Sequence, residues 1–278
     1  MPWAHEVAAV VCTLNSIASI RECLQSLRDA GVGELIVVDA GSSDGTREVA
    51  EQLADRVASD PGTGLGNARN IGIALTTCAY VLNMGSDNVV PYGELDRMLG
   101  YLRDHDLQGV SAQTFIAGDD YVSRGLNDWR RGRFIPGPSA IIGTPTMFVG
   151  DLLRAHPFNA SRRFSDDSEL CERWSREFGA RFAISDAHVL EIGKTSWAEV
   201  KVRCRMYGIS DAEIFSIGCR EGWGLRRRVT SLLHPARVDL IRPLRHLRLR
   251  DAVVSAPFLA AFTGMRYAGW ARSAARSR

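Results

Sequence analysis

The chain has 278 residues, of which 45% are hydrophobic and 24% charged, a composition typical of a globular protein with a sizeable core. The N-terminus shows no basic segment followed by an apolar one, and no apolar run reaches the roughly 18 residues of a membrane span. The six cysteines form no C-x-x-C pair and no zinc-binding spacing, which favours a reducing compartment. We therefore predict a cytoplasmic protein without a secretory signal.

The net charge of +2 conceals an asymmetry along the chain. Residues 225–278 contain twelve arginines and two acidic residues, a net charge of +10, whereas residues 1–224 carry −8. The sequence thus predicts an acidic body followed by an arginine-rich tail.

The N-terminal part alternates buried apolar runs with amphipathic segments. Strands are predicted at residues 6–12, 34–38, 56–59 and 80–82. Helices are predicted around residues 20–27, 46–54 and 64–77. Because short turns join strand to helix, this alternation indicates βαβ units and a mostly parallel sheet.

The pattern is less regular after Pro91. It predicts helices at 95–102 and 165–179 and strands at 109–115, within 141–149 and at 181–190. The polar, glycine-rich and basic segment from Ala117 to Pro138 is interpreted as a long loop over the sheet.

Polar residues follow three of the predicted strands where each strand ends. They are Thr13 to Asn15, Asp39, and Ser86 with Asp87. Carboxyl ends of neighbouring parallel strands open into one crevice, which is where open α/β sheets bind ligands. Asp44, in the turn before Gly45, is interpreted as a turn former.

Four sequence blocks together carry a family resemblance. They are VVCTLNSIASIRECLQSL, ELIVVDAGSSDGT, GLGNARNIGI and YVLNMGSDNVVP, in this order between about Val7 and Pro91. The series resembles a family 2 glycosyltransferase of the GT-A fold, an α/β fold with a Rossmann-like, mostly parallel sheet flanked by helices. The likeness continues more weakly to about Gly208.

The resemblance implies a nucleotide-sugar donor site, and we predict a UDP-sugar as the donor. Thr13, Leu14 and Asn15 would line the base, and the Asp39 carboxylate would accept hydrogen bonds from base and ribose. The planar guanidinium of Arg69 suits the diphosphate. Ser86 is assigned to the same donor site.

Enzymes of this fold usually hold a divalent cation on a D-x-D turn, and the resemblance therefore implies Mn²⁺ or Mg²⁺ on Asp87. Here the turn reads Gly85-Ser86-Asp87, so glycine replaces the first aspartate. One carboxylate and a diphosphate can still coordinate such an ion, because both metals also accept water and phosphate oxygens. The glycine makes dependence on a metal an open question.

The acidic pair Asp166 and Asp167, at the start of a predicted helix, resembles the pair that supplies the catalytic base in inverting members. We assign Asp167 as the general base, a role that burial favours by raising the pKa of a carboxyl group. Asp166 with Glu169 also fits a capping box at the helix start.

The tail interleaves arginines with leucine, isoleucine and valine, and Pro235 and Pro243 are predicted to break it into short helices. Basic helices with apolar faces bind anionic membrane surfaces, so a peripheral position on the inner face of the cell membrane is one interpretation. A homodimer interface and a cap on the catalytic domain are alternatives. Nucleic-acid binding is not predicted, because the body is acidic and no recognition module is visible.

Together these features predict a GT-A domain over residues 5–222 and a helical, arginine-rich extension over 223–278. The predicted activity is inverting transfer of a sugar from a nucleotide sugar to an acceptor hydroxyl, on a glycan or a lipid-linked acceptor. Two alternatives remain from the residues alone. One is a non-catalytic nucleotide-sugar-binding scaffold, suggested by Gly85, and the other is a sugar-phosphate nucleotidyltransferase.

Overall fold

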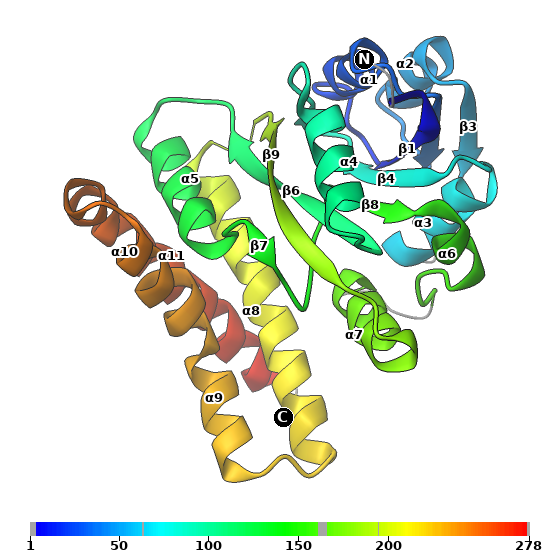
Figure 1. Cartoon of the computed structure of the whole chain (residues 1–278). Coiled ribbons are helices and arrows are strands. Elements are labelled where there is room, and N and C mark those ends of the chain that lie inside the picture. Colours follow the sequence, from blue (N-terminus) through cyan, green and yellow to red (C-terminus); the bar gives the residue numbers. More distant parts are fainter. Residues whose placement is uncertain (1–3, 63, 161–165, 194, 277–278) are drawn as a thin grey trace. The chain divides into compact units, whose positions relative to one another are not determined.

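The computed structural model describes residues 4–62, 64–160, 166–193 and 195–276, and its chain divides into two compact units (Figure 1). The sheet unit comprises Met1–Phe115 and Pro136–Ile192. The helical unit comprises Ile116–Ile135 and Gly193–Arg278. This division differs from the predicted boundary between residues 222 and 223, because the segments 116–135 and 193–222 group with the C-terminal helices.

The sheet runs in the order β3-β2-β1-β4-β8-β6-β9-β5, with β7 paired to β9 (Figure 1). Its strands are β1 (Val7–Thr13), β2 (Glu34–Asp39), β3 (Arg56–Ser59), β4 (Tyr80–Gly85), β5 (Asn88–Val89), β6 (Gly109–Ile116), β7 (Gly137–Pro138), β8 (Thr146–Val149) and β9 (Phe182–Glu191). The strands β3, β2, β1 and β4 are parallel, which confirms the predicted βαβ arrangement. Strand β8 pairs antiparallel with both β4 and β6.

Helices cover both faces of this sheet. They are η1 (Ala4–Glu6, a 3₁₀-helix), α1 (Ile20–Asp29), α2 (Thr46–Leu53), α3 (Leu65–Ala74), α4 (Glu94–Asp104), α6 (Gly150–Ala155) and α7 (Asp166–Phe178). Side chains alternate across a strand, so Val11 of β1 joins the core with α1 and α4, whereas Val10 joins the core with α3 and α7. The near-continuous apolar runs of β1 and β2 follow from this burial on both faces.

The helical unit has its own core. Its helices are α5 (Tyr121–Arg133), α8 (Trp197–Arg220), α9 (Leu225–Pro235), η2 (Ala236–Ile241, a π-helix), α10 (Arg242–His246) and α11 (Leu249–Arg276). Trp129 of α5, Cys204 of α8 and Phe258 of α11 are buried together. Of these helices, α9, η2, α10 and α11 confirm the predicted helical C-terminal extension, whereas α5 and α8 precede it in the chain.

The predicted loop from 117 to 138 is wrong, because most of it forms α5. Asp120 caps this helix and accepts hydrogen bonds from the backbone N–H groups of Val122 and Ser123 at 2.8 and 3.1 Å. The glycines that suggested a loop serve close packing instead. A Cβ atom on Gly125 would lie 2.4 Å from the Phe258 ring.

The predicted breaks at Pro235 and Pro243 are also wrong. Backbone angles at Pro235, Ala236, Ile241 and Arg242 are all right-handed helical, so α9 continues through η2 into α10. Proline lacks an N–H group, and a local π-helical turn is one way in which a helix accommodates the missing bond. Of the helices formed by the described residues, none combines the length and the apolar character that crossing a bilayer requires.

Candidate active site at the carboxyl ends of the parallel strands

The three predicted polar strand ends lie side by side. In the sheet register Thr13 is opposite Asp39, and Cys12 is opposite Gly85. The end of β3 is also adjacent, because Ser59 is opposite Asp39. Four parallel strands therefore bring their carboxyl ends, and the turns that follow them, to one edge of the sheet.

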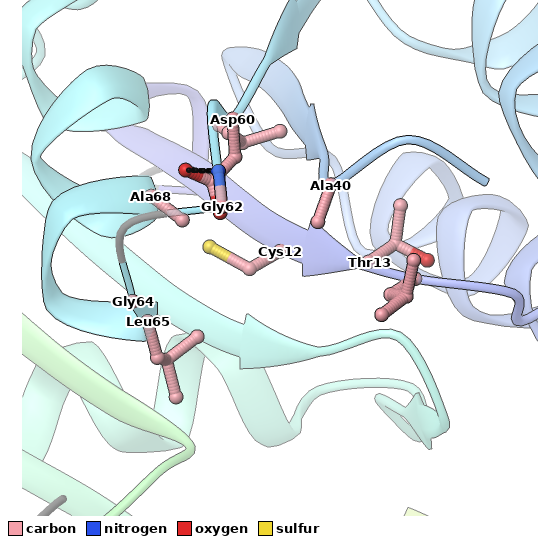
Figure 2. Close-up of a pocket in the computed structure, with 10 residues that line it drawn as sticks. Cys12, Thr13, Ala40, Asp60, Gly62, Gly64, Leu65 and Ala68 are labelled. Carbon is pink, nitrogen blue, oxygen red and sulfur yellow. Dashed lines mark hydrogen bonds between the residues drawn. The ribbon is translucent and has the colours of Figure 1, made fainter. Parts of the chain in front are cut away.

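A pocket of about 290 Å³ opens at this edge (Figure 2). Its lining residues are Cys12, Thr13, Leu14, Val38, Ala40, Asp60, Gly62, Gly64, Leu65 and Ala68. Figure 2 shows Cys12 near the centre, between Asp60 with Gly62 on one side and Leu65 on the other. Thr13 and Leu14 line this pocket, whereas the other predicted donor-site residues lie outside its lining, and the assignment of all of them to a donor site stays a prediction.

Asp60 was not singled out in the sequence, although it also follows a strand end, that of β3. Its Oδ1 atom accepts a hydrogen bond from the Gly62 N–H at 3.0 Å, and its own N–H donates to the Asp39 carbonyl oxygen at 2.8 Å. Asp60 therefore presents an ionisable side chain to the pocket from a fixed backbone position. The signal that could have found it is its position directly after a β-strand, the same signal that identified Asp39.

Asp39 itself is buried and organises the neighbouring turn. Its carboxylate accepts hydrogen bonds from the backbone N–H groups of Gly41 and Ser42 at 3.2 and 3.1 Å, and from the Ser42 hydroxyl at 2.5 Å. The Asn15 side-chain oxygen accepts a bond from the Ser43 N–H at 2.9 Å, which ties the turn after β2 to the turn after β1. Asp39 thus shapes the turn that carries Ala40 into the pocket wall.

Asp44 is confirmed as a turn former. Its carboxylate accepts hydrogen bonds from the Ile17 N–H at 3.1 Å and from the Thr46 hydroxyl at 2.5 Å. These bonds hold the pKa of Asp44 below its ordinary value, and the bond from the Thr46 side chain has the largest effect.

The turn after β4 is fixed by the segment that leads into α1. The hydroxyl oxygens of Ser86 and Ser16 lie 2.8 Å apart, and the Ser19 hydroxyl donates to the Ser86 carbonyl oxygen at 3.0 Å. Ser86 thereby holds the turn that carries Asp87 against the segment between β1 and α1.

Oxygen atoms converge over Gly85. A Cβ atom at this glycine would lie 2.9 Å from Asp87 Oδ1 and 3.0 Å from Asn88 Oδ1. A carboxylate and an amide oxygen are ligands that Mg²⁺ and Mn²⁺ accept, so the donor set fits a divalent cation. Among the residues that the structure describes, no group of three or more His, Cys, Asp or Glu side chains is gathered around one point. Such an ion would therefore rely on other oxygens, those of substrate and water.

A second cluster joins α3 to α7. The Arg69 guanidinium donates from one nitrogen to Asp166 at 2.6 Å and to Asp167 at 2.8 Å, and from the other to the Thr144 hydroxyl. Only 4% of Arg69 is exposed. Burial raises the pKa of Asp167, Arg69 opposes this increase, and Asp166 adds to it. The predicted contact of Arg69 with a diphosphate remains a prediction, since its guanidinium holds the acidic pair here.

The acidic pair is adjacent to the pocket through α3. Residues Leu65 and Ala68 of this helix line the pocket, and Arg69 is the next residue along it. Burial raises the pKa of the Cys12 thiol in the pocket wall to about 12, and the charges of Arg69 and Asp166 act on the same thiol. Glu169 accepts a hydrogen bond from Arg173 at 2.9 Å, and the capping box of Asp166 and Glu169 stays a prediction, because the residues directly before α7 lie outside the described part of the chain.

Residues 8–184 match the family described as Glycosyl transferase family 2, and the chain belongs to that family. It is 31% identical over 105 residues to glycosyltransferase AglJ of Haloferax volcanii, which is 37% of this chain and 35% of the relative. It is 29% identical over 106 residues to a PGL/p-HBAD biosynthesis glycosyltransferase of Mycobacterium tuberculosis, which is 35% of this chain and 41% of the relative. The chain thus spans about two fifths or less of the curated relatives it matches.

Solved structures share the fold over nearly the whole chain. The mannosyltransferase PcManGT from Pyrobaculum calidifontis, in complex with GDP-Man and Mn²⁺, superimposes with a TM-score of 0.64 at 18% identity, covering 98% of this chain and 88% of its own. S. aureus TarS in complex with UDP-GlcNAc gives a TM-score of 0.52 at 14% identity, covering 98% of this chain and 91% of its own. The fold is therefore that of GT-A glycosyltransferases, as the sequence blocks predicted.

Proposed function

We propose that this chain transfers a sugar from a nucleotide-sugar donor to an acceptor hydroxyl with inversion at the anomeric carbon. The observation that carries the proposal is that α3 links two features: residues of α3 line the pocket at the strand ends, and the buried Arg69 of the same helix holds the acidic pair at the start of α7. A pocket beside a carboxyl group with a perturbed pKa is the arrangement expected of a catalytic site. Family membership supports the reaction class.

The donor would bind with its nucleotide in the pocket. Thr13 and Leu14 would face the base, and Asn15 and Asp39 would hold the surrounding turns in place. We propose a UDP-sugar as donor, although similar folds bind both UDP-GlcNAc and GDP-Man. The acceptor would be a hydroxyl on a glycan or a lipid-linked sugar.

The diphosphate would lie toward Ser86 and Asp87, beyond the end of β4. Asp87 and Asn88 would hold a divalent cation. Its positive charge would offset the negative charge of the departing diphosphate. Electrostatic stabilisation of the leaving group is commonly the largest contribution to such a reaction.

Asp167 would remove the proton of the acceptor hydroxyl. As the O–H bond breaks, the acceptor oxygen forms a bond to the anomeric carbon. The bond from that carbon to the donor phosphate breaks, and its electron pair leaves with the nucleoside diphosphate. Arg69 would position the base, because its guanidinium donates a hydrogen bond to Asp167 and is itself held by Asp166.

The test is nucleotide release from UDP-, GDP- and dTDP-sugars, with Mn²⁺ and with a chelator. We expect release of one nucleotide that depends on Mn²⁺ and is lost in Asp87→Ala. If the chelator does not affect release, protein side chains alone offset the negative charge of the leaving diphosphate. Tight binding of one nucleotide without turnover, also in the presence of lipid-linked acceptors, would favour the scaffold alternative.

Asp60 is expected to contribute to recognition of the base. An ionised carboxylate only accepts hydrogen bonds, which suits the ring N–H that uracil and guanine both present. The variant Asp60→Asn should raise KM for the donor by roughly 10- to 100-fold, with kcat little changed. A factor of this size corresponds to the free energy that a hydrogen bond to a charged group contributes. Steady-state kinetics with the donor selected above measures this split.

The matched control is Asp104→Asn, an exposed aspartate at the end of α4. It removes the same charge and should leave KM unchanged. Equal effects of the two substitutions would show that net charge, not contact with the base, governs donor affinity.

A further inference from the structure

Helix α9 of the helical unit turns an apolar stripe outward. Leu225, Val229, Leu232 and Leu233 are spaced i, i+4, i+7 and i+8 and therefore share one helix face. Their exposed fractions are 78%, 44%, 44% and 56%. An amphipathic helix normally buries such a stripe, so this face is suited to contact with an apolar phase outside the molecule.

Positive charge surrounds the stripe and continues beyond it. Exposed arginines of this region are Arg226, Arg227, Arg237, Arg242, Arg245, Arg248 and Arg250. Among the described residues from 224 to 254, Asp251 is the exposed acid. Asp239 does not offset the charge at the surface, because it is buried and accepts bonds from Arg133 at 2.9 Å and Arg266 at 2.6 Å.

A second apolar group follows at the start of α11. Leu249, Val253 and Val254 are 82%, 67% and 59% exposed. Arg248 and Arg250 flank Leu249 in the chain. The same combination of exposed aliphatic side chains and arginines thus occurs twice within 30 residues of one unit. We call these two groups together the basic apolar surface.

We propose that the basic apolar surface docks on bilayers that contain anionic phospholipids. Arginines near such a surface gain electrostatic energy from the lipid head groups, and leucine and valine side chains gain by entering the boundary between head groups and acyl chains. This inference goes beyond the glycosyl transfer proposed above and does not depend on it.

Two other occupants fit the observations less well. A second copy of the chain, joined by a two-fold axis through this surface, would bring arginines against arginines, and like charges across an interface are costly. A nucleic-acid duplex would attract the arginines through its phosphates, but it offers no apolar phase for the exposed leucines. Of these three occupants, the bilayer is the one that matches both the positive charge and the apolar stripe.

The test is sedimentation of the full chain with vesicles of phosphatidylcholine alone and of phosphatidylcholine mixed with phosphatidylglycerol. We expect binding to the mixed vesicles only, weakening as salt is added. The triple variant Arg226→Gln, Arg237→Gln, Arg245→Gln should bind roughly a hundredfold more weakly, at about fivefold per arginine. The variant Leu225→Gln, Leu233→Gln should also bind more weakly.

The matched control replaces three exposed arginines of the sheet unit, Arg21, Arg176 and Arg181, by glutamine. It removes the same charge and should bind mixed vesicles like the unaltered chain. Circular dichroism melting establishes that every variant is folded. Absence of binding to mixed vesicles would overturn the proposal, as would an equal loss in the control.

Two further measurements separate the rival occupants. Sedimentation velocity would overturn the proposal if Leu225→Gln, Leu233→Gln abolished a dimer without affecting vesicle binding. Binding of duplex DNA more tightly than mixed vesicles, with the same dependence on Arg226, Arg237 and Arg245, would likewise overturn it.

Discussion

Replacing Asp167 by asparagine is expected to lower kcat by about 10²- to 10⁴-fold, because an amide cannot take up the acceptor proton. Asparagine retains the shape of the side chain and an oxygen that can still accept a bond from Arg69. The measurement is the rate of nucleotide release at saturating donor and acceptor. KM for the donor should change little if Asp167 acts only in the chemical step.

Asp166→Asn is the matched control for this prediction, because both carboxylates contact the same guanidinium nitrogen. The charge of Asp166 helps to raise the pKa of Asp167, so its removal should lower that pKa. The acidic limb of the rate profile should then move to lower pH, with kcat largely retained. Equal losses of kcat in the two variants would contradict the assignment of Asp167 as the base.

The raised pKa of Asp167 also predicts a change in stability with the opposite sign to the change in activity. Because burial raises this pKa in the folded state, the folded chain binds the proton more tightly than the unfolded chain. This tighter binding adds to the free energy of unfolding at pH values below the ordinary pKa of an aspartate. The added free energy is lost as the pH rises through the raised pKa of Asp167. Asp167→Asn should therefore increase Tm at neutral pH and have little effect in acid. A lower Tm at neutral pH would contradict this cause of the shift.

The sequence predicted the strand ends of the sheet unit well because their physical signals are local. Apolar runs such as Val7–Thr13 are buried on both faces, and a polar residue follows where the strand leaves the sheet. Asp60 carries the same signal more weakly, since β3 has four residues and is only half-buried. A short edge strand gives little periodicity, and its terminal carboxylate is then easily overlooked.

The errors arose where packing decides the structure. Gly125 and Gly132 suggested a loop, yet they allow α5 to approach Phe258 and Pro243, and a Cβ atom would come within 2.4 and 2.2 Å of these residues. The apolar spacing of Val122, Leu126 and Trp129 was a helical signal present in the same segment. Such glycines can be interpreted only when the partner helix is known.

The acidic cluster was predictable in its members but not in its connections. Arg69 and Asp167 are 98 residues apart, and no sequence pattern pairs them. The family resemblance and the planar set of donors on the guanidinium therefore predict a contact with a diphosphate. The fold places the guanidinium where it donates hydrogen bonds to both carboxylates, an arrangement that depends on the position of α7 beside α3.

Replacing Arg69 by glutamine is expected to lower the free energy of unfolding by about 3–5 kcal/mol, because a buried ion pair that loses one partner leaves charge without compensation. Here two carboxylates would remain, and Arg69 is 4% exposed. Urea unfolding followed by circular dichroism gives the difference. The control Arg28→Gln breaks a pair with Asp55 whose side chains are 32% and 43% exposed, and it should cost at most about 1 kcal/mol.

A double variant tests whether the loss has an electrostatic origin. Arg69→Gln combined with Asp167→Asn should be more stable than Arg69→Gln alone, because one of the two carboxylates no longer carries charge. Arg69→Lys keeps the charge but lacks the planar set of donors that reaches Asp166, Asp167 and Thr144, so an intermediate loss is expected. A double variant no more stable than Arg69→Gln would indicate lost packing instead.

The same substitution separates the two roles considered for Arg69. If the guanidinium serves the acidic pair, its removal raises the pKa of Asp167 further, since Arg69 lowers it. The acidic limb of activity should then move to higher pH, and the stability of the variant should improve as pH falls and the carboxylates take up protons. If Arg69 serves the diphosphate instead, KM for the donor should rise while the unfolding energy and the pH profile stay unchanged. The first pattern would identify Arg69 as a residue that positions the base. The second pattern would identify it as a residue that binds the diphosphate of the donor.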